Sequence, residues 1–161
     1  MAAPNQSQRN LILDQLVVLL KTIAVEAGDG TTPALVTRDL KDADQVTDFP
    51  TLCVLEAQRS SFALIEAMGG GGAMGYQHRF GVSVYGYVRA TDGRSRSQWL
   101  EDLWADVANK VVNSFELVVN GIALAMNIEP IGDRETDGGV LEPRGAFVQD
   151  FAVLYVTGQP A

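Results

Sequence analysis

The sequence predicts an α+β fold in which a mainly antiparallel, mixed sheet of about five strands carries two main helices on one face. Three observations support this. Tyr76–Ala90 alternates apolar and polar residues, two segments repeat apolar residues with the helical period, and the links around the long stretch are short. The 161 residues, of which 47% are hydrophobic, are enough to bury one core. We therefore expect a single domain over 1–161, with polar tails at 1–9 and 158–161.

The long stretch 76–90 predicts a strand with two different faces. Gly81 and Gly86 interrupt it, and an interior glycine in a strand marks a bulge or a close backbone approach. The residues expected to face the core are Phe80, Val82, Val84 and Val88. The residues expected on the outer face are Gln77, Arg79, Ser83, Tyr85, Tyr87 and Arg89.

Two helices are predicted from periodicity and capping residues. The first spans 7–27, with Ser7 or Asn10 as N-cap and Gly28 just beyond its end. Its apolar arc is wider than burial on one side requires, so we expect cover on more than one side, from its own domain or from another subunit. The second spans 97–113 and opens on a capping box from Ser95 to Gln98. Its expected inner stripe is Leu100, Leu103, Trp104, Val107 and Val111, and its expected solvent-facing residues are Glu101, Asp102, Asp106, Asn109 and Lys110.

The remaining strands are shorter. We expect strands at 34–38 and 51–57, whereas the apolar residues of 60–68 fit either a strand or a short helix. Segments 115–119 and 122–128 flank Asn120–Gly121, the dipeptide that best suits a two-residue hairpin turn. The range 130–145 is charged and contains glycines, which predicts a long loop. The stretch 146–157 is apolar on both faces, which predicts a central strand.

Charge and cysteine content exclude several classes of protein. A net charge of −8 and a pI near 4.5 argue against a surface that grips nucleic acid, although DNA could still slide past an acidic wall. Cys53 is the only cysteine, so no intrachain disulfide can form. The N-terminus does not read as a signal peptide, and no stretch approaches the ~18 apolar residues of a membrane helix. We expect a soluble protein made in the cytoplasm.

The sequence offers little catalytic chemistry. His78, the sole histidine, is in phase with the apolar face of the long strand, which predicts a buried structural role. Gly70, Gly72 and Gly75 match a dinucleotide-binding spacing, but a strand follows them where that motif needs a helix. No Cys/His cluster suits zinc, and the acidic range 39–48 lacks the pattern of a calcium loop. We therefore expect no catalytic residues, metal or cofactor, and no enzyme.

The side chains that remain are ones that suit protein contacts. Tyrosine and arginine together are enriched at interfaces, although an ordinary exposed sheet face explains them equally well. The two glycine-containing loops and the wide apolar arc of the first helix add further candidates. The candidate contact residues are Tyr85, Tyr87, Arg79, Arg89, Leu13, Val17, Met68, Gly70, Gly72, Met74, Arg134, Glu135 and Asp137.

The order of the expected elements and the residue pattern from 11 to 156 resemble those of a known family. The resemblance is to the tail terminator proteins of long-tailed bacteriophages, also called minor tail or tail completion proteins. The run Gly69–Gly72 departs from the family pattern. The segments that carry the resemblance are the N-terminal apolar helix, Leu35–Arg38, Asp48–Glu56, Phe80–Val88, Leu100–Trp104 and Phe147–Val156.

This resemblance implies a small virion subunit at the head-proximal end of the tail. Such subunits form a ring, typically of six, which caps the tail tube, stops its growth and offers its other side to the head. The implied partners are further copies of the chain, the tail tube protein and head–tail connector proteins, with DNA only in passage and no membrane. Two alternatives stay open: a head–tail joining (neck) protein, and a small-ligand-binding α+β domain that uses the glycine loop.

Overall fold

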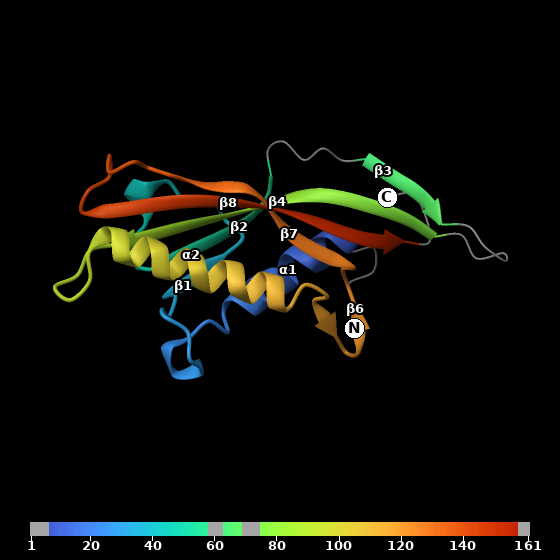
Figure 1. Ribbon diagram of the computed structural model, residues 1–161, viewed down its shortest axis with the longest axis horizontal. Helices are drawn as coiled ribbons and strands as arrows, with labels where there is room; N and C mark the ends of the chain where they lie inside the picture. The colour runs from blue at the N-terminus through green and yellow to red at the C-terminus, as the bar shows by residue number, and fades with distance from the viewer. Residues whose placement is uncertain (1–6, 58–62, 69–74, 158–161) are drawn as a thin grey trace.

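The sheet is built around its longest strand, β4 (Gly75–Arg89), which runs along the long axis of the molecule (Figure 1). The computed structural model describes residues 7–57, 63–68 and 75–157. β4 pairs antiparallel with β8 (Arg144–Thr157) from Tyr76 opposite Thr157 to Arg89 opposite Arg144, with no register shift. The long strand and the central closing strand that the alternation predicts are therefore both confirmed.

Six strands form the main sheet. Its order is β1 (Leu35–Thr37), β2 (Thr51–Glu56), β4, β8 and β7 (Asn127–Thr136), and β3 (Ala63–Met68) pairs with the first half of β4. β1 and β2 are parallel, and all other pairs in this sheet are antiparallel. This arrangement confirms the α+β prediction, and the described part of the segment left open by the sequence, 63–68, is a strand.

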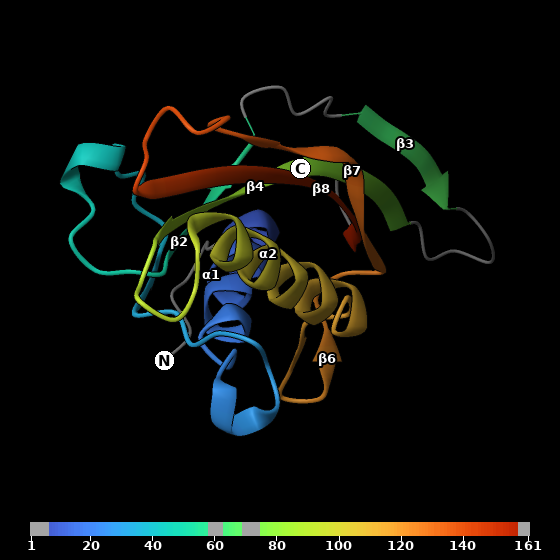
Figure 2. The ribbon, with the colours of Figure 1, turned by 60° about the vertical axis from the view of Figure 1, so that its left-hand side comes forward.

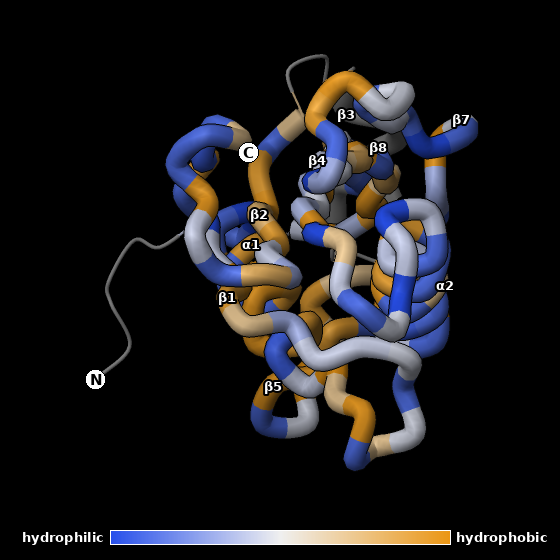
Figure 3. The backbone as a smooth tube through the Cα atoms, turned by 90° about the vertical axis from the view of Figure 1, so that its left-hand side faces the viewer, coloured by the Kyte–Doolittle hydropathy of each residue, from blue (hydrophilic) through white to orange (hydrophobic). Residues whose placement is uncertain are grey.

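Two helices cover one face of the sheet (Figure 2): α1 (Gln8–Leu20) and α2 (Arg96–Asn113). The core lies between the helices and the sheet, and α1 is hydrophobic over most of its length (Figure 3). The β4 residues predicted to face this core are all buried, which confirms the inner face of the strand. They are Phe80, Val82, Val84 and Val88.

The helix starts follow their capping residues, but the end of α1 does not follow its apolar pattern. The Ser7 hydroxyl accepts the Asn10 amide, and α2 opens on the predicted capping box. α1 ends at Leu20, seven residues before the predicted end at 27. A separate 3-10 turn, η1 (Val25–Ala27), follows, and Gly28 ends that turn with φ +95°. The Thr22 hydroxyl donates to the Leu19 carbonyl, a local bond that competes with continued helix.

The predicted hairpin at Asn120–Gly121 is confirmed. It joins β5 (Val118–Val119) to β6 (Ile122–Ala123), and both turn residues have positive φ as a type I′ turn requires. The prediction of one continuous strand over 122–128 is wrong. β6 ends at residue 123, and a new strand, β7, begins at 127 in the main sheet.

The predicted loop 130–145 is wrong over 130–136, where β7 continues, and the connection to β8 is the shorter segment 137–143. β7 is an edge strand whose exposed positions are mostly polar but include Ile131, so it has no apolar alternation to reveal it. Pro130 is tolerated because an edge strand can lack a donor. The pairing with β8 shifts between Ile131 and Glu135, which forms a bulge in which Gly132 has φ +64°.

Candidate assembly surface

The face of the sheet opposite the helices carries the predicted contact residues of β4, but part of it is covered. Tyr87 is only 8% exposed, and its hydroxyl donates to the Lys41 carbonyl at 2.8 Å. It packs with Val46 and Cys53 in a second small core. The expectation that Tyr87 is exposed is therefore wrong, because the connector 41–50 between β1 and β2 lies over it. Tyr85 is half-buried beside this cluster.

Burial in this small core also changes the pKa values of two side chains. Removal from water raises the pKa of the Cys53 thiol and the pKa of the Tyr87 hydroxyl above their ordinary values. Both groups therefore stay neutral around pH 7. Cys53 is thus a buried thiol within this small core.

Two arginines stand side by side at the end of the outer face. Arg89 and Arg144 are directly opposite each other in the β4–β8 pairing. Arg144 donates to the Ala43 carbonyl at 2.8 Å and lies 3.4 Å from an Asp44 carboxylate oxygen. Arg89 is exposed, and in the part of the chain that the structure describes it forms no ion pair. The hollow beside these arginines has a volume of about 420 Å³ and is lined by Val46, Thr47, Phe49, Arg89, Pro143 and Arg144.

A second hollow, in the middle of the same face, is acidic. Ser83 donates to the Asp150 carboxylate at 2.5 Å. Asp133 and Glu135 come from the β7 bulge, are exposed, and make no ion pair with any described residue. The volume is about 420 Å³, and the lining residues are Ala57, Ser83, Tyr85, Asp133, Glu135, Val148 and Asp150.

The bulge that carries these acids is held from the opposite face by Gln149, which the sequence analysis did not single out. Gln149 is buried, and its amide group donates to the carbonyls of Ile131 and Gly132 at 3.5 and 3.3 Å. The indole N–H of Trp104 donates to its carbonyl oxygen at 3.0 Å. A glutamine within an otherwise apolar strand was the signal available in the sequence.

Two candidate contact residues from the 130–145 range are engaged within the chain instead. Asp137 accepts hydrogen bonds from the amides of Leu141 and Ala146 and pairs with Arg96, and its side chain is almost fully buried. Arg134 pairs with Glu101 of α2, and its guanidinium lies over the Trp104 ring. Their side chains stabilise the turn and the edge of the sheet. Glu135, by contrast, lines the acidic hollow.

The other candidates divide by position. Leu13 is 3% exposed in the main core, and Val17 packs against that core, so α1 is covered here by its own sheet. Arg79 is exposed and lies 4.0 Å from Glu129 of β7. Met68 is the last residue of β3. Gly70, Gly72 and Met74 lie outside the described residues.

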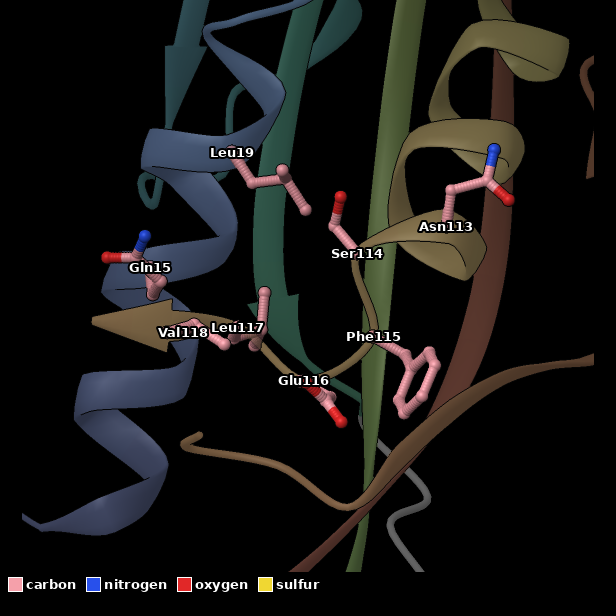
Figure 4. A pocket seen from close by; sticks show the side chains of 8 residues that line it. All are labelled: Gln15, Leu19, Asn113, Ser114, Phe115, Glu116, Leu117 and Val118. Atoms are coloured by element: carbon pink, nitrogen blue, oxygen red, sulfur yellow. The ribbon is translucent and has the colours of Figure 1, made fainter. Parts of the chain in front are cut away.

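The helix side carries a groove that sequence reasoning missed (Figure 4). It has a volume of about 520 Å³ and lies between α1 and the segment that leaves α2. Val118 on its wall is 53% exposed, and Ile122 in the same hairpin is 66% exposed. The lining residues are Gln15, Leu19, Asn113, Ser114, Phe115, Glu116, Leu117 and Val118.

His78 occupies the buried position that its phase predicts. Its ring is fully buried, stacks on Tyr155 at 4.9 Å between centroids, and places Nε2 2.7 Å from the Thr157 hydroxyl. Within the described ranges, no three His, Cys, Asp or Glu side chains are grouped to hold a metal ion. None of the helices seen there combines the length and apolar character that a bilayer crossing needs.

The fold is similar to that of a solved structure described as the sheath/tube terminator, in the extended state, of an extracellular contractile injection system, PVC. The superposition has a TM-score of 0.57 with 12% sequence identity. It covers 99% of this chain but 59% of the other, so this chain spans less than two thirds of that terminator. At this identity the likeness establishes a shared fold. No protein-family model and no curated protein matches the chain.

Proposed function

We propose that this chain is a tail terminator of a long-tailed bacteriophage. Copies of it form a ring on the last layer of the tail tube, stop tube polymerisation, and present the opposite side of the ring to the head. The observation that carries this proposal is the fold, which is shared over 99% of the chain with a sheath/tube terminator. The sequence resemblance points to the same role independently.

The charge of the chain supports the part of the proposal that concerns DNA. Each copy carries a net charge of −8, so a ring of six is strongly acidic. An acidic channel wall repels phosphate groups and lets DNA pass without binding it. A ring of six copies and a head-facing side are the specific expectations of this proposal.

A second candidate is a terminator in a contractile injection system. It is favoured by the source of the structural neighbour, whose description names both sheath and tube. The two candidates predict different partners. A phage terminator binds tube and head–tail connector proteins, whereas this second candidate binds tube and sheath.

Tube growth provides the test. The tail tube protein of the same particle is polymerised in the presence of increasing amounts of the purified protein, and tube lengths are measured by electron microscopy. We expect shorter tubes with added density at one end. An unrelated acidic protein of the same net charge is the control for non-specific electrostatic effects. Unchanged tube lengths and bare tube ends would contradict the proposal, and binding only to a connector would identify a neck protein.

A further inference from the structure

The arginine pair at the end of the outer face is electrostatically incomplete within one subunit. Arg89 and Arg144 are directly opposite each other, and like charges in this arrangement destabilise a strand pair. Asp44 is the acid nearest to Arg144, but its side chain is 91% exposed and the pair is therefore weak. Arg89 has no ion pair among the described residues. A carboxylate from outside the subunit would relieve this repulsion.

The hollow beside the two arginines suits a carboxylate on a protein surface. Val46, Phe49 and Pro143 line it, so a charged group entering it is partly removed from water. Guanidinium groups bind carboxylates with two parallel hydrogen bonds, and partial removal from water strengthens that interaction. An acidic side chain on a second protein surface would both fill the hollow and neutralise the arginines.

The same chain supplies the complementary group. Asp133 and Glu135 lie on the bulge of β7, at the edge of the sheet, and both are exposed. With Asp150 they place three carboxylates around one hollow, and neither bulge acid is paired with a cation in the described ranges. With a net charge of −8, a copy of this chain is a better source of the anion than nucleic acid, whose phosphates the whole molecule repels.

We propose that the arginine hollow of one subunit binds the β7 bulge of the next copy, with Arg89 and Arg144 facing Asp133 and Glu135. The contact joins two different patches, so it is head-to-tail, and head-to-tail contacts close into rings when the rotation permits. The inference rests on the proposed ring function and gives that ring its subunit contact. Gln149 positions the bulge for this contact through the carbonyls of Ile131 and Gly132.

Charge reversal tests the pairing directly. Arg89→Glu and Glu135→Arg are made separately, and assembly is followed by sedimentation velocity and by capping of polymerised tube. Each variant alone places like charges across every contact, so the protein concentration needed for half assembly should rise at least about tenfold. An equal mixture of the two variants should assemble like the wild type. In a ring with an even number of subunits, the two variants can alternate. Every contact then joins either the introduced Glu to the introduced Arg, or the native Arg89 to the native Glu135.

Controls separate charge from position. Lys21→Glu and Glu26→Arg reverse exposed charges elsewhere on the surface and should assemble normally. Thermal unfolding of each monomer should stay close to that of the wild type, because Arg89 and Glu135 are exposed. Normal assembly of both single variants, or failure of the mixture to recover, would overturn this contact while the terminator function stands. A wild type that forms no ring, alone or on tube, would overturn both.

Discussion

Asp137 connects the turn after β7 to the rest of the fold through three hydrogen-bond donors. Burial by itself raises the pKa of its carboxyl, but the Ala146 and Leu141 amides and the Arg96 guanidinium more than offset this, and the pKa lies below its ordinary value of 3.8. A carboxyl whose folded pKa is depressed stabilises the native state above its unfolded pKa. That contribution is lost as the pH falls through the folded pKa.

The variant Asp137→Asn should therefore lose stability in a pH-dependent manner. At pH 7 we expect the free energy of unfolding to fall by about 1–3 kcal/mol, because a charged acceptor is removed from buried donors. As the pH falls below 3.8 and through the lower folded pKa, the difference from the wild type should shrink, since protonation removes the same charge from the wild type. Urea unfolding at several pH values measures this, with the exposed Asp92→Asn as control. A difference that is constant across pH would contradict the assignment.

Single residues also show where sequence reasoning succeeds and fails. The caps Ser7 and Ser95 and the turn Asn120–Gly121 were predictable because their partners lie within a few residues. Asp106 was expected in solvent on α2, but it is buried and accepts the Gly30 amide and the Thr31 hydroxyl. Helical periodicity gives the face of a residue but not the distant loop that folds over it. Tyr87 was misjudged for the same reason, since a connector covers it.

At the scale of elements, the close packing of β4 and β8 depends on Gly86. A Cβ atom at this position would lie 2.2 Å from the Phe147 ring, which occupies the space over the glycine. The two residues are cross-strand partners on the face that carries the helices. The sequence suggests either a bulge or a close backbone approach at this glycine. The β4–β8 register is unbroken there, so the structure shows a close approach.

Gly86→Ala should destabilise the protein by about 1–3 kcal/mol, the usual cost of overpacking a core. Chemical denaturation measures the change, and Gly93→Ala is the matched control because nothing lies within 4 Å of its added Cβ. The double variant Gly86→Ala with Phe147→Leu should lose less stability than the sum of the losses of the two single variants. The smaller leucine side chain leaves room for the added Cβ atom. If the two changes in the free energy of unfolding were strictly additive, the clash with the Phe147 side chain would not be the cause of the destabilisation.

The helices and strands with the most regular spacing of apolar residues were the easiest to predict. β4, α2 and β8 have one continuous pattern each, and all three lie close to their predicted positions. β7 was read as a loop because an edge strand with a proline and a bulge has no such pattern. The candidate contact surface was only partly predictable for a related reason. Arg89 and Glu135 remain exposed, whereas Leu13 and Asp137 are used within the chain.

At the scale of the whole molecule, features suited to assembly occur on both sides of the sheet. The outer face has a basic hollow and an acidic hollow at separate positions, and the helix side has a groove with exposed apolar residues in the adjoining hairpin. A ring subunit on a tube needs contacts to two neighbours and to the tube.

The proposed function requires this chain to form a ring at the end of a tail tube. Electron microscopy of the wild-type protein mixed with its tube tests it most directly, by class averages of tube ends viewed from the side and along the axis. We expect a closed ring of six subunits, with an open central channel, on one end of each tube. Tube ends without a ring, at protein concentrations that saturate any weaker binding, would contradict it.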